Sequence, residues 1–357
     1  MFNMKIAVAG ALSVDICPTF TTEGAENFGD LITAGRITHI EGNEIHPGGP
    51  VANTGLALKI FGIHPVMCAR IGRDDMGKML YEILSKKMRP FSVDTISIDE
   101  KDATAYSIIL SPPGLDRAIL QNPGANDNFT SRDILWNEVK KCRMFHFGHP
   151  STMAKLYEND GDELVRIMKK AYGYGLVTSL DLCAIDPNSK AASADWRKIL
   201  ERVLPYVDFF MPSIGDLEGI LTDDAQKADA RQLAEELKEM GAKSIIIKLG
   251  EEGMYYSNPG ADFFRSIEKK LHISSHYMEN WEKREGYIPA VPAEKNISGL
   301  GAGDVTVAAY LAAMMHTQSF DETLRLALTE GSLCLSDPSA TGGLKPFSEL
   351  TDVLELL

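Results

Sequence analysis

Buried strands and helices alternate along the chain from residue 4 to residue 249, and this alternation constrains the fold more than any other feature of the sequence. Short apolar runs that fit buried strands are followed by longer stretches that fit helices. Strands separated in this way pair in parallel, and a parallel sheet needs helices over both faces. We therefore predict an α/β fold with a doubly wound, mostly parallel sheet and helices on both faces. The predicted strands are 4–12, 66–71, 143–147, 177–181, 207–211 and 244–249, and the predicted helices include 77–87, 152–175, 226–240, 320–335 and 347–356.

A second group of short segments with strand character interrupts this alternation. These segments are 31–45, which is predicted to be a hairpin, 92–98, 104–111 and 117–121. Strands interposed among strand-helix units suggest a small separate sheet, for which a lid is the natural role. We predict a single domain over residues 1–357, with the lid strands inserted at about 31–46 and 92–122.

Two other segments remain open from the sequence. Residues 259–290 fit the alternation poorly and carry charged clusters, so we predict a polar surface insertion with one short helix and assign it no function. The small-residue loop 337–343 either forms the floor of a purine pocket or simply turns the chain, and turning the chain is the commoner role of such a loop.

Composition and charge exclude several classes of partner. The 357 residues contain 36 Lys and Arg against 50 Asp and Glu, which gives a net charge of −14. This charge argues against a nucleic-acid backbone or an anionic membrane surface as the main partner. The five cysteines are widely spaced and contain no C-x-x-C pair, as expected of reduced thiols in a cytoplasmic protein. No signal peptide and no membrane-spanning segment is expected from the sequence.

A glycine-rich turn late in the chain is the first candidate for chemistry. Gly299, Gly301 and Gly303 precede Asp304, and the Ala-rich apolar run after Asp304 fits a buried helix. The first turn of such a helix offers unpaired N–H groups and the positive end of its dipole, so it can bind an anion. A carboxylate there is held ionised and is suited to accept a proton beside a bound phosphate. Taken alone, however, a glycine turn followed by a capping Asp is common in α/β proteins.

Two standard nucleotide motifs are excluded. No G-x-x-x-x-G-K-[ST] sequence occurs, so the chain has no P-loop of the Walker type. Residues 299–304 read G-x-G-x-G-D instead of G-x-G-x-x-G, and they lie near the end of the chain and not in a first strand-helix unit. Both observations argue against a Rossmann dinucleotide site.

Two more candidate ligand contacts lie near the start of the chain. Asp15 follows the first predicted strand, where ligands bind in doubly wound sheets, although it could equally be a cap or turn residue. Gly48 and Gly49 precede a helix that ends near Gly62, and Asn53 lies one turn into it. Asn53 is either a reader of a ligand hydroxyl or a buried amide that satisfies a loop carbonyl.

Three stretches in this order resemble the ribokinase, or PfkB, family of carbohydrate kinases. They are Gly10-Ala11-Leu12-Ser13-Val14-Asp15, Gly48-Gly49-Pro50-Val51-Ala52-Asn53 and Gly301-Ala302-Gly303-Asp304. The similarity covers nearly the whole chain and includes 72–77, 123–126 and the position of the predicted lid. It implies a ribokinase-like fold and an ATP-dependent transfer of a phosphoryl group to a hydroxyl.

The resemblance also implies residue roles. Asp304 matches the general base, and the N–H groups of Gly301, Ala302 and Gly303 match an anion hole. Asp15, Gly48, Gly49 and Asn53 match the positions that hold the hydroxyl-bearing acceptor. Ser213, Asp216, Lys248, Gly250 and Gly253 match the positions that hold the nucleotide. Asp216 is also a candidate metal ligand, since Mg²⁺ would neutralise the phosphates. A monovalent cation is a further candidate cofactor.

The chain departs from the family pattern at three places. Ser298-Gly299-Leu300 stand where the family commonly has Asp-Thr-Thr. The pattern Asn-x-x-Glu appears as Ser213-Ile214-Gly215-Asp216, and Asp-x-Asn-x-Arg is reduced to 181–185, which ends at Ile185. These departures bear on metal handling and turnover, whereas Asp304 and its glycines are intact.

The predicted function is therefore phosphorylation of a small sugar or sugar acid, with the fructokinase and ketosugar-acid branches resembled most. A nucleoside kinase is the alternative within the same class, and a non-catalytic sugar-binding homologue is the alternative outside it. The expected partners are a small-molecule sugar and a nucleotide. Lid strands with alternating faces could pair across a twofold axis, which would give a homodimer.

Overall fold

A large, mostly parallel sheet forms the centre of the molecule. The computed structural model describes residues 4–20, 25–115, 117–274, 276–294 and 299–350. The strand order is β14-β13-β12-β11-β10-β9-β1-β4, parallel from β4 to β12 and antiparallel at β13 and β14. The strands are β1 (Lys5–Gly10), β4 (His64–Cys68), β9 (Met144–Gly148), β10 (Val177–Leu180), β11 (Phe209–Phe210), β12 (Ser244–Lys248), β13 (Met254–Ser257) and β14 (Glu285–Ile288).

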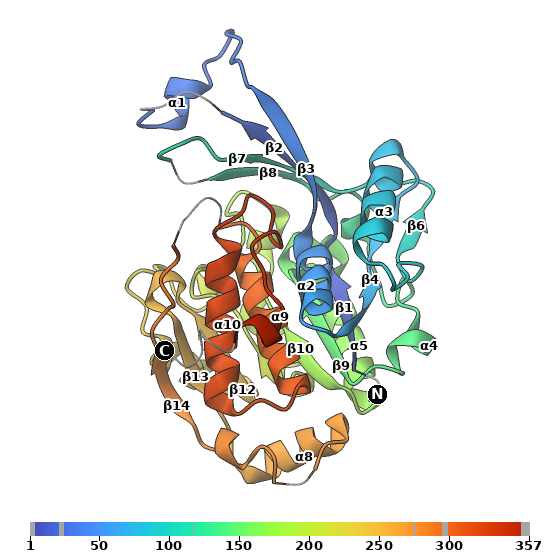
Figure 1. Cartoon of the computed structure of the whole chain (residues 1–357), viewed down its shortest axis with the longest axis vertical. Helices are drawn as coiled ribbons and strands as arrows, with labels where there is room; N and C mark the ends of the chain where they lie inside the picture. Colours follow the sequence, from blue (N-terminus) through green and yellow to red (C-terminus); the bar gives the residue numbers. More distant parts are fainter. Residues whose placement is uncertain (1–3, 21–24, 116, 275, 295–298, 351–357) are drawn as a thin grey trace.

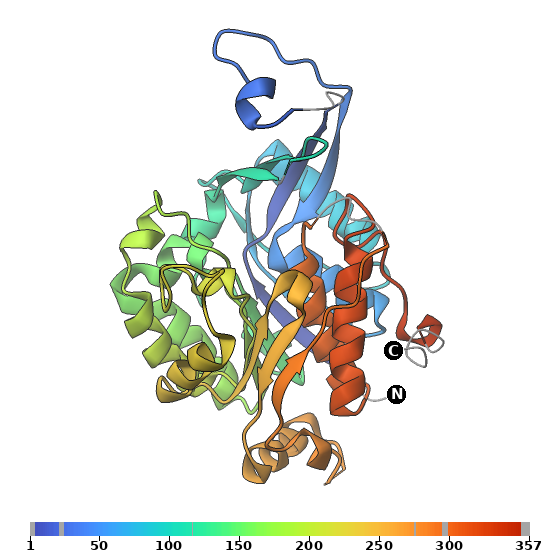
Figure 2. The same cartoon turned by 90° about the vertical axis from the view of Figure 1, so that its left-hand side faces the viewer.

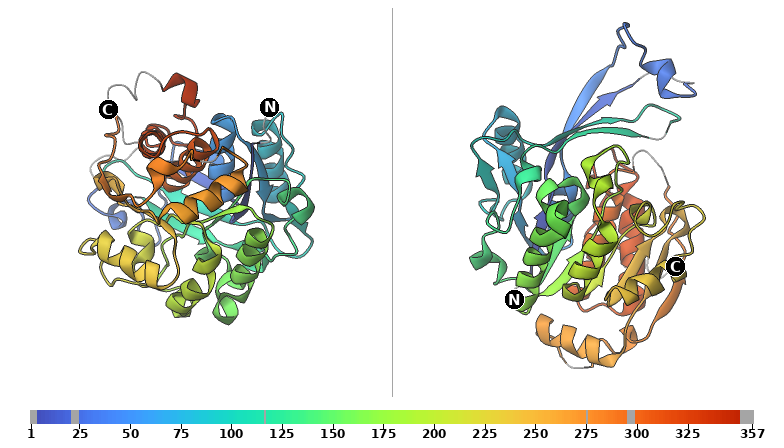
Figure 3. Two further views of the ribbon diagram at one scale, coloured as in Figure 1. Left: turned by 90° about the horizontal axis from the view of Figure 1, so that it is seen from below. Right: turned by 180° about the vertical axis from the view of Figure 1, so that it is seen from behind.

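Helices cover both faces of this sheet, which confirms the predicted α/β class. One face packs against α2 (Gly49–Ile60), α3 (Asp75–Lys87), α8 (Ala261–Leu271), α9 (Ala302–Met315) and α10 (Phe320–Cys334), and the other against α5 (Ala154–Gly173), α6 (Trp196–Val203) and α7 (Ala230–Glu239). Figure 1 shows α9 and α10 in front of the sheet, and Figure 3 shows the opposite face from behind. Because the inner strands are covered on both sides, β9, β10 and β12 are buried along their whole length instead of alternating.

A four-stranded lid projects beyond the large sheet, as Figure 2 shows. Its order is β3-β2-β7-β8, formed by β2 (Ser13–Thr19), β3 (Gly42–Gly48), β7 (Tyr106–Leu110) and β8 (Ala118–Asn122). A separate lid sheet was predicted, but its first part was placed wrongly. The partner of β3 is β2, and residues 32–41 contain no strand. The prediction failed because β2 follows β1 after only two residues, so nothing in the sequence indicated that a second strand begins there.

The predicted lid segment at 92–98 also lies elsewhere. Its described strand, β6 (Ser97–Asp99), pairs with β5 (Arg70–Gly72) in a small two-stranded sheet beside the core. Arg70 stabilises this small sheet, since its guanidinium binds Asp99 and lies 2.7 Å from Asp133 Oδ1. The lid therefore takes only β7 and β8 from the 92–122 region.

The chain passes directly from the large sheet into the lid. Only Ala11 and Leu12 separate β1 in the large sheet from β2 in the lid. The buried side chain of Asn126 fixes this junction, because its Oδ1 accepts a hydrogen bond from Leu12 N–H and its Nδ2 donates to the Leu12 carbonyl, both at 3.2 Å.

Residues 259–290 are not the surface excursion that was predicted. The segment forms α8 and then β14, which joins the edge of the large sheet, and Trp281 is fully buried between them. Charged residues at exposed positions hid the apolar positions that pack inward, such as Phe264 and Met278. The prediction of one short helix was correct, and β14 was missed.

The helix boundaries needed smaller corrections. The helix predicted at 152–175 is α5, with non-helical backbone at Glu158–Gly161, and the helix predicted from 226 begins at Ala230. The last predicted helix, 347–356, starts as a short 3-10 turn at Phe347–Glu349, and residues 351–357 lie outside the described part. Two further short helices are α1 (Phe28–Leu31) and α4 (Trp136–Val139). Within the described residues, none of the helices has both the length and the apolar character needed to cross a bilayer.

Candidate active site

The start of α9 is buried in the molecule, next to the start of α2. Every residue of α9 from Asp304 to Met314 is buried, as expected for a helix that is apolar on all sides. Gly301 precedes the helix with φ +75°, a backbone conformation that favours glycine, and a Cβ there would lie 2.4 Å from Ala340 Cβ. The glycine therefore allows the chain to turn tightly into the helix and leaves the first-turn N–H groups at 302–304 without helical partners.

Asp304 has one carboxylate oxygen in a hydrogen bond and the other in an ion-pair contact, with no hydrogen-bond partner of its own among the described residues. Asn53 Nδ2 donates to Asp304 Oδ2 at 2.9 Å, and His149 Nε2 lies 3.3 Å from Asp304 Oδ1. The Thr54 hydroxyl donates to the Asp304 carbonyl at 3.2 Å, which ties α2 to the first turn of α9. Asp304 and Asn53 therefore contact each other, and the contact joins two helix starts 251 residues apart in sequence.

The opposite side of the site is formed by the ends of β9, β10 and β12. Lys248, the last residue of β12, donates from Nζ to Oδ2 of Asp181, which directly follows β10, at 2.6 Å. Both side chains are largely buried. A Cβ on Gly303 would lie 3.4 Å from Lys248 Nζ, so the ammonium is next to the glycine turn. The two sides thus bring a helix start with unpaired N–H groups and a buried cation together.

The charged groups around Asp304 and Lys248 keep both side chains ionised. Burial disfavours an ionised Asp304, but His149, Asn53 and Lys248 outweigh it and hold the pKa of Asp304 below its usual value. Burial likewise disfavours the Lys248 ammonium, but Asp181, Asp216 and Asp304 outweigh that effect and raise its pKa. Asp304 is therefore a carboxylate and Lys248 an ammonium at neutral pH.

Asp15 lies on the lid side of the site, in β2. Its carboxylate accepts a hydrogen bond from the Ser13 hydroxyl at 3.0 Å and is almost fully buried. A Cβ on Gly48 would lie 2.0 Å from Asp15 Oδ2, so only glycine fits opposite this carboxylate. Gly49 has φ +79°, and a Cβ there would lie 2.6 Å from the Ala11 carbonyl oxygen. Burial raises the pKa of Asp15 to about 6, although Ser13, Ser107 and His46 counteract it.

The residues predicted for the nucleotide lie after β11 and β12. Ser213 and Asp216 close a turn on each other: Ser213 N–H donates to Asp216 Oδ2 at 2.7 Å, and Asp216 N–H donates to the Ser213 hydroxyl at 3.2 Å. Gly250 and Gly253 have φ +59° and +102°, and a Cβ on Gly253 would lie 2.0 Å from the Ile288 carbonyl oxygen. The close approach at Gly253 is therefore explained by packing on β14, and no described contact joins either glycine to Asp304.

Two sets of side chains near the site could hold a cation. His149, Asp181 and Asp304 each offer one atom within 4.8 Å of the others. Lys248 already occupies an oxygen of Asp181, which makes this group a poor fit for Mg²⁺. Asp216 has one oxygen that accepts from Ser213 and a second with no described donor, and a single carboxylate plus nucleotide phosphates is a usual setting for Mg²⁺. Asp216 therefore fits Mg²⁺ better than the His149 group does.

The sequence analysis missed two residues of this site. His149 follows β9 and Asp181 follows β10, so both lie at the carboxyl ends of parallel strands, as Asp15 does after β1. A polar residue directly after a buried strand could have been predicted to lie in the site, but this reasoning was used only for Asp15. Of the departures from the family pattern, Ile185 packs against the core face that carries α5, and Ser298 lies outside the described residues.

Comparison with known proteins agrees with this geometry. The model of the pfkB family of carbohydrate kinases matches residues 11–346. The chain is similar to fructokinase-2 of Solanum habrochaites, with 22% identity over 98% of this chain and 99% of that protein.

Two solved structures share the fold. Arabidopsis thaliana ribokinase, solved with ribose and ATP, matches with a TM-score of 0.72 and 18% identity over 99% of both chains. A Burkholderia thailandensis nucleoside kinase, solved with inosine, matches with a TM-score of 0.70 and 17% identity over 98% of both chains. The fold is thus ribokinase-like, and since the family model spans nearly the whole sequence, the chain belongs to the pfkB family of carbohydrate kinases.

Proposed function

We propose that this kinase transfers the terminal phosphoryl group of ATP to a hydroxyl of a small sugar or sugar acid. One observation carries the proposal: an ionised Asp304 is held at the first turn of α9, beside the Gly301–Gly303 turn and the Lys248 ammonium. A base, unpaired amides and a cation in one place are what phosphoryl transfer to an alcohol requires, because the transition state carries charge on the phosphoryl oxygens.

In the proposed step, Asp304 takes the proton from the acceptor hydroxyl. The acceptor oxygen forms a bond to the γ-phosphorus while the bond from that phosphorus to the β-phosphate oxygen breaks, and ADP leaves with the bonding electrons. The proton then passes from Asp304 to solvent. The N–H groups of Gly301, Ala302 and Gly303 and the ammonium of Lys248 stabilise the charge on the phosphoryl oxygens during transfer.

We assign the acceptor to the side of the site formed by Asp15, Gly48, Gly49 and Asn53. A buried carboxylate can accept hydrogen bonds from two hydroxyls at once, and the absence of a Cβ at Gly48 leaves only backbone opposite it. Asn53 is next to the base, since its amide nitrogen contacts Asp304. This arrangement would hold a diol with one hydroxyl turned toward Asp304.

We assign the nucleotide to the side formed by Ser213, Asp216, Lys248, Gly250 and Gly253. Asp216 would hold Mg²⁺ together with the nucleotide phosphates, and when bound the ion neutralises phosphate charge. Lys248 would contact the transferred group directly, since it lies beside Gly303. Support for an ATP site also comes from the shared fold with a ribokinase solved with ribose and ATP.

The test is ADP formation by the purified protein with Mg²⁺-ATP and a panel of hexoses, pentoses, keto-sugar acids and nucleosides. We expect turnover with a sugar or sugar acid and a product phosphorylated once. Turnover confined to nucleosides would replace the sugar assignment with a nucleoside kinase, which shares this fold in a solved relative. Binding without any product, measured by a rise in melting temperature, would favour a non-catalytic sugar-binding protein.

We further propose that two copies pair through their lids. Exposed aliphatic side chains gather on the lid and the loop that leads to it: Ile32, Ile37, Ile40, Ile45, Ile119 and Leu120. Ile37 is 86% exposed and Leu120 57% exposed, and such a group on a small sheet and its loop is typical of an association surface. Light scattering should give twice the chain mass, and Leu120→Lys should shift the protein toward monomer.

A further inference from the structure

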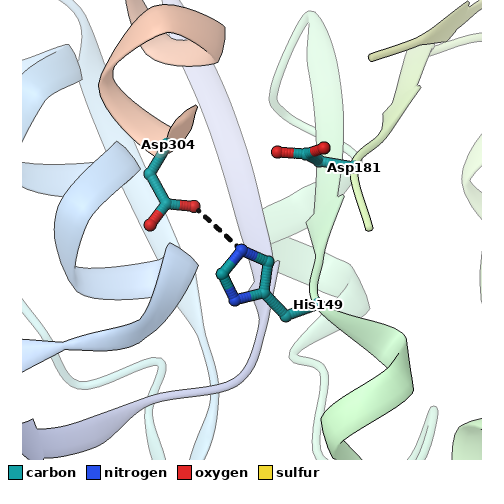
Figure 4. A group of neighbouring side chains, drawn as sticks. All are labelled: His149, Asp181 and Asp304. Atoms are coloured by element: carbon teal, nitrogen blue, oxygen red, sulfur yellow. Dashed lines mark ion pairs between the residues drawn. The ribbon is translucent and has the colours of Figure 1, made fainter. Parts of the chain in front are cut away.

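His149 reaches Asp304 from the opposite side of the site. It follows β9 and has φ 57° and ψ 47°, a left-handed conformation that residues other than glycine rarely adopt. Its carbonyl accepts hydrogen bonds from Thr152 N–H at 3.2 Å and from the Thr152 hydroxyl at 2.9 Å, which fixes the backbone in this conformation. Figure 4 shows the resulting direction of the ring, with one nitrogen facing the carboxylate of Asp304.

With this contact, the Asp304 carboxylate has a neighbouring side chain at each oxygen, Asn53 on one side and His149 on the other. His149 Nε2 lies 3.3 Å from Oδ1, and Asn53 Nδ2 lies 2.9 Å from Oδ2. Asn53 comes from α2 on the same face as α9, whereas His149 comes from the end of β9. Without His149, the described side-chain donors would hold Asp304 from one side only, and the carboxylate plane would be free to rotate about that single contact.

The charges around His149 favour its protonated form. Burial lowers the pKa of the imidazole, but Asp304 on α9, Asp181 after β10 and Asp216 after β11 outweigh burial and raise it above its usual value. The other groups that face this region are Lys248 on β12 and His146 on β9. Burial lowers the pKa of His146 to about 3, so His146 is neutral and does not compete for the carboxylates.

We propose that His149 is a positioning residue for the general base, and that the ion pair of its Nε2 with Asp304 Oδ1 keeps the carboxylate ionised and turned toward the acceptor hydroxyl. This inference rests on the proposed kinase function, since it assigns to His149 a role that acts through Asp304. His149 itself makes no bond to the substrate. Its loss therefore slows the transfer step and leaves acceptor binding largely intact.

The kinetic test compares two substitutions at one position. His149→Gln keeps a neutral N–H donor, and His149→Leu removes the donor while keeping bulk. We expect kcat to fall about tenfold in the first and about a hundredfold in the second, within the range of contributions from groups that support acid-base catalysis. The KM for the acceptor should change less than about threefold, since the role acts through the base and not through binding.

The pH dependence gives a readout that a merely structural role would not change. The acidic limb of the kcat/KM profile reports ionisation of the base. Loss of the positive imidazole raises the pKa of Asp304, so this limb should move to higher pH in both variants. His276→Gln is the matched control, because His276 also pairs with a carboxylate, that of Glu279, but lies exposed on the surface. It should leave kcat and the pH profile unchanged.

An NMR titration separates this inference from the proposed function. The Cε1–H signal of His149, assigned by its absence in His149→Gln, should titrate above the usual range of about 6.5. The Asp304→Asn substitution should lower that pKa whether or not any substrate is found. An unchanged His149 titration in Asp304→Asn would overturn the inference. So would a His149→Leu enzyme with wild-type kcat and pH profile, or one in which only KM changes, whereas an absence of all turnover in the wild type would overturn the proposed function instead.

Discussion

The two sides of the site are built in different ways. On one side, the starts of α2 and α9 present backbone groups at Gly48, Gly49, Gly301 and Gly303, and the absence of Cβ atoms lets other groups approach within close range. On the other side, the ends of β9, β10 and β12 present charged side chains, and the geometry depends on ion pairs. Backbone shape defines the first side and side-chain charge the second. Asp304 lies where they meet.

This difference predicts how each side responds to change. A site made by backbone shape tolerates no added atom, and its N–H and carbonyl groups do not titrate, so any pH dependence there comes from the side chain of Asp15. A site made by buried charges is sensitive to the loss of one partner, because the other charge is left without compensation. Substitutions on the two sides should therefore differ in kind as well as in size.

The largest effect is expected at the meeting point of the two sides. Asp304→Asn keeps the shape and removes the base, so kcat should fall by about 10³-fold, with acceptor affinity by calorimetry changed little. Asp321→Asn is the control, since Asp321 lies in the first turn of the neighbouring α10 but outside the site. A variant that keeps more than a tenth of wild-type kcat would contradict the assignment of the base.

The next largest effect is expected on the charged side. Lys248→Met leaves Asp181 buried without its partner, which should cost about 3–5 kcal/mol of the free energy of unfolding. The same change should lower kcat about a hundredfold, because one donor to the phosphoryl group is lost. Both quantities are accessible, by urea denaturation and by the ADP assay.

An exposed pair at the same distance provides the control for Lys248. Lys141 Nζ lies 2.6 Å from Glu138 Oε1, as Lys248 Nζ lies 2.6 Å from Asp181 Oδ2, but the first pair is on the surface. Lys141→Met should change neither stability nor activity measurably. Equal losses of stability in the two variants would show that burial does not distinguish the two ion pairs.

A smaller effect is expected on the backbone side. Gly48→Ala would place a methyl group 2.0 Å from Asp15 Oδ2 and should raise the KM for the acceptor about tenfold or more, by displacing that carboxylate. Gly42→Ala, in the same strand β3 with nothing within 4 Å, should leave KM unchanged. If both variants raise KM alike, a general perturbation of β3 explains the result instead.

The smallest effect is a pH dependence of acceptor binding. The pKa of Asp15 is raised to about 6 by burial, so its carboxylate is ionised above this pH and protonated below it. The KM for the acceptor should therefore rise by up to about tenfold per pH unit as the pH falls below that value. Asp15→Asn should raise KM at every pH and remove this dependence. A wild-type KM that is constant from pH 7 to pH 5 would exclude Asp15 as a hydroxyl acceptor.

The same contrast explains what could be predicted from the sequence. Gly48, Gly49, Gly301 and Asp304 lie in short contiguous motifs, because backbone shape is encoded by neighbouring residues. The Asp181–Lys248 pair joins residues 67 positions apart, and no short spacing marks it. His149 lies in no motif, and its one signal, its position after the predicted strand 143–147, was not used. Asn53 and Asp304 were each singled out because each lies in a motif of its own, but the contact between them was not predicted.

Some strands of the fold were predicted from the sequence and others were not, for a similar reason. The parallel strands and their covering helices were predicted because burial on both faces gives uninterrupted apolar runs. The lid strand β2 and the edge strand β14 were not, since one continues a core strand without a break and the other is short and polar on its outer face. Tertiary pairing, not local pattern, makes each of them a strand.

The Asn126 clamp on Leu12 has a mechanical consequence. A side chain that binds both the N–H and the carbonyl of one residue stops the strand from sliding along its own axis at that point. Asp15 lies three residues beyond this fixed point on the same strand. Under the proposed function, a change in the angle of the lid would therefore turn the Asp15 carboxylate, and with it a bound sugar, about Leu12, with Asn126 as the pivot.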